Sequence, residues 1–143
     1  METTDAPLAE NEIRKQLYRF FLALDERQFD TMTQIMTPDG LWRRAGIEIR
    51  GGGMLLEVMG KRGADRHTRH ILSNMIIDME TAEAATARFY STAWVYVGAP
   101  DEKGVCPIDI PSSIGVYTAK FARTEKGWQM ADLRSKPAFK QQK

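Results

Sequence analysis

The segment AATARFYSTAWVYV, residues 84–97, shows which half of this chain forms a sheet. It is rich in β-branched and aromatic residues, which favour strands. Its apolar residues do not alternate cleanly with polar ones, which is typical of a strand covered on both faces. Three more segments of strand-like composition flank it: residues 68–79, 114–123 and 128–135. We therefore expect the second half of the chain to be a meander of long antiparallel strands.

The first half of the chain has helical periodicity instead. From residue 10, apolar side chains recur at the spacing of one helix face; they are Ile13, Leu17, Phe20, Phe21 and Leu24. The segments that follow predict, in order, a break at 28–30, a short helix, a turn at 37–40 (TPDG), a hairpin at 41–50 and a helix at about 54–61. Helices followed by antiparallel strands indicate an α+β domain in which helices pack on one bent sheet. We expect one domain at residues 10–136, between disordered tails at 1–9 and 137–143.

Composition sets limits on the partners of the chain. Its 143 residues carry a formal net charge of +1, so no overall field favours nucleic acid or an anionic membrane, and we expect neither as a partner. Basic residues do gather locally, and we expect them to be solvated surface: Arg43, Arg44 and Arg50 in one group, Lys61, Arg62, Arg66 and Arg69 in another.

Cysteine content and terminal sequence predict the cellular compartment. Cys106 is the only cysteine, so the chain cannot form an internal disulfide. The first twelve residues lack the basic start and apolar centre of a signal peptide. No stretch approaches the ~20 apolar residues that cross a bilayer. We expect a cytoplasmic protein.

Histidine is the side chain best suited to acid–base chemistry near neutral pH, and the chain has two, His67 and His70. Residues three apart on a strand point to opposite faces, so these two would not share a metal ion. Neither has a cysteine nearby, and the pattern HExxH is absent. We expect no metal site and no cofactor.

Asp25 and His70 are the candidates for a proton-transferring pair. On its strand His70 should point inward with Leu72 and Asn74, and at about 100° per residue Asp25 falls on the helix flank that holds Tyr18 and Phe21. A structural histidine and a solvated helix-terminal aspartate are the alternatives. If the two residues met, the aspartate would orient the ring and stabilise its protonated form.

Large side chains are candidates for the walls of a pocket around that pair. The candidates for substrate contact are Tyr18, Phe21, Trp42, Met54, Phe89, Tyr90 and Tyr117. Most such residues in a domain of this size are ordinary core. A tyrosine hydroxyl near the pair could donate a hydrogen bond to a developing oxyanion.

The order of these features resembles the SnoaL-like branch of the nuclear-transport-factor-2-like superfamily. The resemblance rests on LDERQFD at 24–30, TPDG at 37–40, Gly51, RHILSN at 69–74 and the final GW at 127–128. It implies a cone-shaped α+β barrel with a pocket inside, assembled into homodimers or homotrimers. Enzymes of the family such as scytalone dehydratase use an aspartate on the first helix and a histidine on the long strand. Asp25 and His70 match these positions.

The chain departs from the dehydratase pattern at three places. Scytalone dehydratase has a second active-site histidine on the next strand, where this chain has RFY at 88–90. It also has a tyrosine just before the aspartate, where this chain has Leu24, and related dehydratases carry a catalytic tyrosine near the position of Trp42. The resemblance therefore supports a pocket with an Asp–His pair but not dehydration in particular.

Two main functions remain open from the sequence, beside epoxide hydrolysis, for which an enzyme of this fold would use an Asp–Arg–Asp set. The first is a cofactor-independent lyase or isomerase acting on a small apolar cyclic or aromatic molecule, with His70 as base and Asp25 orienting it. The second is a non-catalytic binding or assembly module, such as the small subunit of an aromatic-ring-hydroxylating dioxygenase. An internal cavity of about 300 Å³ or more beside the pair would favour the enzyme.

Overall fold

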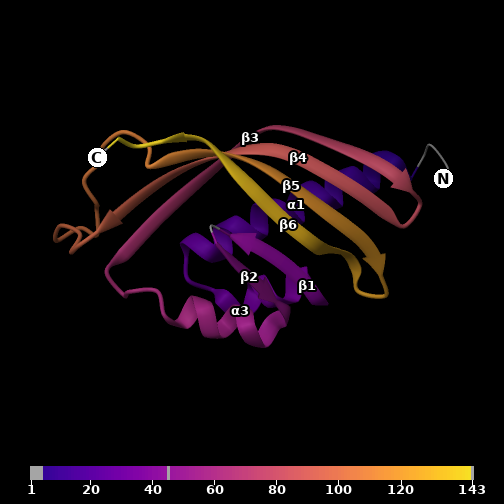
Figure 1. Ribbon diagram of the computed structural model, residues 1–143, viewed down its shortest axis with the longest axis horizontal. Coiled ribbons are helices and arrows are strands. Elements are labelled where there is room, and N and C mark those ends of the chain that lie inside the picture. Colours follow the sequence, from indigo (N-terminus) through magenta and orange to yellow (C-terminus); the bar gives the residue numbers. More distant parts are fainter. Residues whose placement is uncertain (1–4, 45, 143) are drawn as a thin grey trace.

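The computed structural model describes residues 5–44 and 46–142, which form three helices and a six-stranded sheet. The helices are α1 (Ala6–Asp25), α2 (Phe29–Ile35) and α3 (Gly51–Gly60); the strands are β1 (Met36–Arg44), β2 (Ile47–Arg50), β3 (Arg66–Thr81), β4 (Ala84–Val97), β5 (Ser113–Thr124) and β6 (Gly127–Lys140). The long strands β3 to β6 form a bent sheet that arches over α1, with α3 and the β1–β2 hairpin beneath it (Figure 1). The predicted cone-like α+β class is confirmed.

The core lies between the concave face of the sheet and the apolar stripe of α1. Ile13, Leu17 and Phe20 from that stripe are fully buried, as are Phe89 of β4 and Met130 of β6. Burying an aliphatic or aromatic side chain of this size contributes roughly 1.5–3 kcal/mol. The spacing that predicted the helix therefore also fixes which of its faces meets the sheet.

The sheet is mixed, which corrects the expectation of purely antiparallel strands. Its order is β2-β1-β6-β5-β4-β3, and β1 pairs with β6 in parallel while the other neighbours are antiparallel. A parallel pair requires a long connection, and here the whole segment from β2 to β5 lies between the two strands. Apolar patterning shows which face of a strand is buried, but it carries no information about the direction of a distant neighbour.

The TPDG segment at 37–40 is not a turn between elements, as predicted, but an irregular stretch within β1. The pairing of β1 with β6 passes from Met36 directly to Leu41. At Gly40 an added Cβ would lie 3.1 Å from the backbone oxygens of Met130 and Thr37. The glycine is thus needed for close approach of two backbones rather than for a reversal of the chain.

A bulge divides β3 into two halves. Ser73 pairs with Tyr90 and Ile76 with Arg88, so two residues of β3 stand opposite one residue of β4. Asn74 adopts φ 54° there, a left-handed conformation that asparagine tolerates better than most residues. Asn74 is therefore exposed instead of lying inward beside His70 as expected.

Both ends of the folded region extend beyond the expected limits of 10 and 136. Helix α1 begins at Ala6, and β6 continues to Lys140. Residues 1–4 of the predicted N-terminal tail, residue 143 of the C-terminal tail and Ala45 of the predicted hairpin lie outside the described residues. None of the helices in the described part combines the length and apolar composition that a bilayer crossing requires.

Candidate functional site

Asp25 is the last residue of α1, and its carboxylate reaches across to β3. Its Oδ1 lies 2.6 Å from Nδ1 of His70 and accepts a 2.8 Å hydrogen bond from the hydroxyl of Thr68. Its Oδ2 accepts a 2.7 Å hydrogen bond from the backbone N–H of His70. The side chain of Asp25 is 5% exposed and that of His70 12%. A nearly buried carboxylate is thus satisfied by three donors from one strand.

This contact assigns a tautomer to the His70 ring. Because the carboxylate can only accept, Nδ1 is the nitrogen that carries the proton toward Asp25. In a neutral ring Nε2 then holds the free electron pair. The arrangement can take up a proton at Nε2, with the carboxylate placed to stabilise the charged imidazolium that results.

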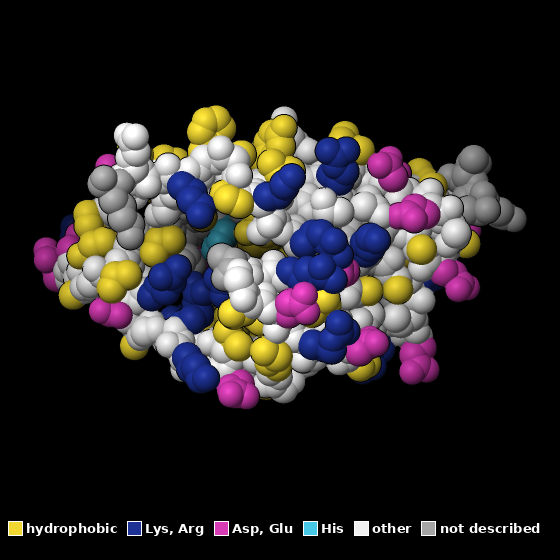
Figure 2. Space-filling view, viewed as in Figure 1, with side chains coloured by type: hydrophobic (Ala, Val, Ile, Leu, Met, Phe, Trp, Pro, Cys, Tyr) yellow, Lys and Arg dark blue, Asp and Glu magenta, His cyan; other side chains and the backbone are white. Residues whose placement is uncertain are grey.

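A cavity of about 230 Å³ opens on the inner side of His70. It is lined by Phe21, Leu24, Trp42, Arg44, Arg62, Arg66, Thr68, His70, Ala93, Val95, Ser113, Tyr117 and Ser135. Asp25 is not part of this wall, because it lies behind the histidine ring. Figure 2 looks into a hollow of the surface in which a histidine side chain is visible, bordered by Lys and Arg side chains.

Some of the predicted wall residues lie at this cavity and others do not. Phe21, Trp42 and Tyr117 line it, and Phe89 packs behind two of them, 6.0 Å from Phe21 and 5.3 Å from Tyr117 between ring centroids. Contact of these rings with a substrate remains a prediction.

Three predicted residues lie on the surface, away from the cavity: Tyr18, Met54 and Tyr90, with exposures of 48%, 41% and 45%. Tyr18 lies on α1 outside its buried stripe, and Met54 lies on α3 outside the face formed by Leu55 and Met59. The inward residues of β4 are odd-numbered, so Tyr90 points outward.

The cavity also holds three arginines that sequence reasoning assigned to solvated surface. Arg44 comes from β1, Arg62 from the loop after α3 and Arg66 from the start of β3. Arg66 shares a face of β3 with Thr68 and His70, because the three alternate along the strand. The even spacing of four between Arg66 and His70 was the available sequence signal; Arg44 and Arg62 carry no comparable local signal.

Burial and repulsion from neighbouring arginines lower the pKa of Arg44 and Arg62. For Arg62, burial first and then the charges of Arg66, Arg44 and Arg27 lower the pKa to about 10. For Arg44, burial is the main cause of a lowered pKa, opposed by Tyr117 and assisted by Arg66. The three positive charges are therefore close enough to disfavour one another.

Tyr117 supplies a hydroxyl to the same cavity. Burial raises the pKa of its phenol, and a hydrogen bond from Ser135 and the charge of Arg44 oppose this only in part. Tyr117 is therefore neutral at physiological pH and able to donate a hydrogen bond into the site.

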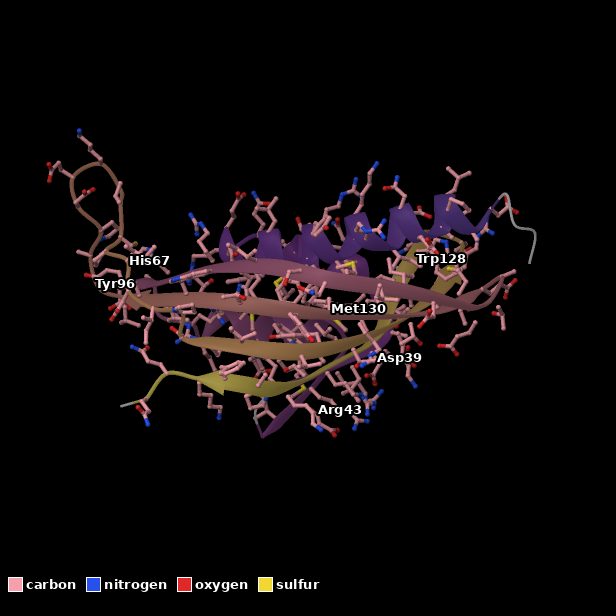
Figure 3. All side chains as sticks on the ribbon, turned by 90° about the horizontal axis from the view of Figure 1, so that it is seen from above. Asp39, Arg43, His67, Tyr96, Trp128 and Met130 are labelled. Carbon is pink, nitrogen blue, oxygen red and sulfur yellow. The ribbon has the colours of Figure 1, made fainter. Side chains whose placement is uncertain are left out.

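The other histidine belongs to a different surface. His67 stacks on Tyr96 with ring centroids 6.3 Å apart, and Figure 3 shows both at the end of the sheet beside the loop at 98–112. They border an open groove of about 840 Å³ on the outer face, with Trp94 and Ile108. His67 and His70 thus face opposite sides of the sheet. Within residues 5–44 and 46–142, no group of three His, Cys, Asp or Glu side chains is placed to hold a metal ion.

Comparison with known proteins gives a family match and several similar folds. The model of the SnoaL-like domain matches residues 6–134. The hexachlorocyclohexane dehydrochlorinase LinA-type3 of Novosphingobium barchaimii LL02 is 16% identical, with a TM-score of 0.81 over 98% of this chain and 93% of that one. A scytalone dehydratase-like protein of Novosphingobium aromaticivorans is 17% identical, with a TM-score of 0.75 over 96% and 89%. An NTF2-like protein with a cystatin-like fold from the same organism is 19% identical, with a TM-score of 0.75 over 91% and 82%. No curated protein sequence matches the chain.

Proposed function

The chain belongs to the SnoaL-like domain family, and from this premise we propose that it is a cofactor-independent lyase or isomerase with His70 as its general base. The observation that carries the proposal is the 2.6 Å contact between Asp25 Oδ1 and His70 Nδ1, made by a histidine that lines a cavity. Asp25 acts as a positioning residue, because it lies behind the ring and does not face the cavity.

The proposed reaction begins when Nε2 of His70 removes a proton from a carbon next to a carbonyl group. The ring becomes an imidazolium that Asp25 stabilises, and the electron pair of the broken C–H bond moves toward the carbonyl oxygen. In an elimination the pair then expels a leaving group from the adjacent carbon; in an isomerisation the imidazolium returns the proton to a different carbon. The neutral phenol of Tyr117 is a suitable donor to the developing oxyanion.

Two of the similar structures favour this class of reaction. The names of the dehydrochlorinase and of the dehydratase-like protein describe eliminations, of hydrogen chloride and of water. At 16% and 17% identity the likeness is one of fold, so the reaction of this chain has to be argued from its own site.

The size of the cavity narrows the substrate class. At about 230 Å³ it falls below the ~300 Å³ that was expected to favour the enzyme, which is the lower end of ordinary ligand pockets, and it holds roughly eight water molecules of ~30 Å³ each. Phe21, Trp42 and Val95 give it apolar walls. We propose a substrate with a single ring, at the small end of the apolar cyclic or aromatic molecules that the sequence left open.

Proton exchange tests the proposal without knowledge of the natural substrate. The probes are 3-cyclohexenone, which isomerises by proton transfer, and 3-hydroxycyclohexanone, which loses water; both are followed by proton NMR in deuterated water. His70→Gln is expected to lower the rate of exchange at the carbon next to the carbonyl by about 10²–10⁴-fold. His67→Gln is the matched control on the same strand and should exchange at the wild-type rate. Equal rates in wild type and His70→Gln would remove the base assignment.

A non-catalytic assembly module is the second candidate, and the outer face of the sheet favours it. Ile71, Ile76 and Tyr90 are exposed there by 55%, 63% and 45%. We propose that this face also joins copies of the chain into a homodimer or homotrimer. Sedimentation velocity of Ile76→Lys should show a smaller species than the wild type, while Leu22→Lys, on the exposed side of α1, should not.

A further inference from the structure

The charge of the cavity does not balance. Arg44, Arg62 and Arg66 line it, and no acidic side chain of the described residues does. Asp25 is the carboxylate whose charge acts on Arg62, but its two oxygens already accept hydrogen bonds from Thr68 and His70. The charge of Asp25 raises the pKa of Arg62 only as the weakest of the influences on that group, so the three positive charges of the wall are balanced only in part.

None of the three guanidinium groups has an ion-pair partner among residues 5–44 and 46–142. The ion pairs in that part of the chain involve other basic residues, namely Arg43, Lys61, His70 and Arg134. The Nε of Arg66 is moreover buried without any hydrogen-bond partner. A buried donor left unpaired costs free energy, so a protein retains one mainly where a ligand or water satisfies it.

Neighbouring residues hold the side chain of Arg44 and the backbone that carries Arg62. Cζ of Arg44 lies 4.8 Å from the ring centroid of Trp42, a cation–π contact within the cavity wall. The loop that carries Arg62 is fixed by Arg27, whose guanidinium donates to the backbone oxygens of Arg62 and Gly63 at 3.1 and 3.2 Å. Positively charged groups that are both preorganised and unpaired are suited to binding an anion.

We propose that Arg44, Arg62 and Arg66 form a binding subsite for the carboxylate of a single-ring organic acid, which they hold beside His70. As a statement about the substrate of the reaction, this inference rests on the proposed function; as a statement about binding, it does not. Guanidinium groups match a carboxylate because their N–H groups donate two parallel hydrogen bonds to its oxygens. The apolar walls then receive the ring, and the carboxylate offsets one of the three positive charges of the wall.

The subsite would also assist the chemistry at His70. When a base removes a proton from the carbon next to a carboxylate, negative charge accumulates on the carboxylate oxygens. Fixed positive groups at those oxygens stabilise the charge as it develops. The arginines thus make a poorly acidic carbon a feasible target for the Asp25–His70 pair.

Binding of benzoate, with benzamide as its neutral isostere, tests the subsite. Isothermal titration calorimetry at constant ionic strength is expected to show that the wild type binds benzoate at least about tenfold more tightly than benzamide, the effect of one charge-assisted contact. Arg66→Gln should abolish the preference. Arg69→Gln is the matched control, since Arg69 lies on the outer face of the same strand and lines only the outer groove.

The outcomes separate this inference from the proposed reaction. His70→Gln should keep the preference for benzoate even though it loses proton exchange. Equal affinity for the two probes, no binding of benzoate, or the same loss in Arg69→Gln as in Arg66→Gln would overturn the subsite and leave the base assignment standing. Tighter binding of inorganic phosphate than of benzoate would overturn the assignment to a carboxylate. If benzoate is preferred but the rate of proton exchange is the same in His70→Gln as in the wild type, the proposed reaction is overturned and the subsite is not.

Discussion

Thr68 and His70 donate to the same oxygen of Asp25. The Thr68 hydroxyl lies 2.8 Å from Oδ1 and His70 Nδ1 lies 2.6 Å from it, and both residues project from one face of β3. The carboxylate thereby joins the end of α1 to the edge strand β3 of the sheet. The same contacts that orient the histidine ring therefore also hold two elements of the fold together.

Thr68→Val removes one of these donors while nearly preserving volume. Asp25 then keeps two donors, and we expect the free energy of unfolding to fall by about 1 kcal/mol in urea denaturation. Thr68→Ser keeps the hydroxyl and should recover most of the loss. A valine variant as stable as the wild type would show that the Thr68 hydroxyl contributes nothing to the placement of Asp25.

Arg62→Gln is expected to raise the melting temperature of the ligand-free protein, because it removes a charge that burial and neighbouring arginines disfavour. Lys61→Gln is the control; it changes an exposed cation that lies 3.7 Å from the carboxylate of Glu57. The pKa of Arg62, lowered by burial from its ordinary value to about 10, sets the sign with pH. Above about pH 10 and up to the higher pKa of the unfolded chain, the unfolded chain binds more protons at this residue, so its contribution to stability rises with pH there. A lower melting temperature for Arg62→Gln at neutral pH would mean that Arg62 has a structural partner.

Tyr117 should be the last of the four tyrosines to ionise in an alkaline titration followed by phenolate absorbance. Its pKa is raised by burial, so the folded protein holds the phenol proton more tightly than the unfolded chain does. This stabilising contribution is complete below the unfolded pKa of about 10 and is lost as the pH rises through the folded pKa. In Tyr117→Phe the late-titrating component should disappear. If the late-titrating component persisted in Tyr117→Phe, the phenol with the raised pKa would belong to another tyrosine.

Asn74 tests the strained position in the bulge. Its φ of 54° suits glycine and penalises a β-branched residue by about 1–2 kcal/mol. Asn74→Gly should therefore be close to wild type in urea denaturation, and Asn74→Val should be clearly less stable. Thr92→Val, on the neighbouring strand β4, is a control for valine in regular sheet. Equal stabilities for Asn74→Gly and Asn74→Val would contradict the positive φ.

Local periodicity predicted most of the fold. The stripe from Ile13 to Leu24 is buried, and the four long strands lie where their composition places them. Periodicity could not show that β1 and β6, which are far apart in the sequence, run parallel to each other. It also could not show that the alternation of inward and outward side chains along β3 shifts by one residue at Asn74. Both depend on contacts between residues far apart in the sequence.

The candidate site was only partly accessible from sequence. The meeting of Asp25 with His70 rested on a family resemblance, since no spacing rule links residues on two different elements. The arginines were missed because a charged residue is usually solvated, and composition does not show that Arg44 and Arg62 converge on one cavity. Tyr90 was included because it is aromatic, although the alternation along β4 turns it outward.

The bulge in β3 gives one strand two independent alignments. Up to Leu72 the inward residues are even-numbered and include Arg66, Thr68 and His70; after the bulge they are odd-numbered and include Ile77. The extra residue of the bulge is what allows both sets to face inward despite the change from even to odd numbers. A single-residue deletion at 74 or 75 should therefore restore regular alternation with both sets still inward, whereas a deletion elsewhere in β3 should turn the residues on one side of it to the opposite face.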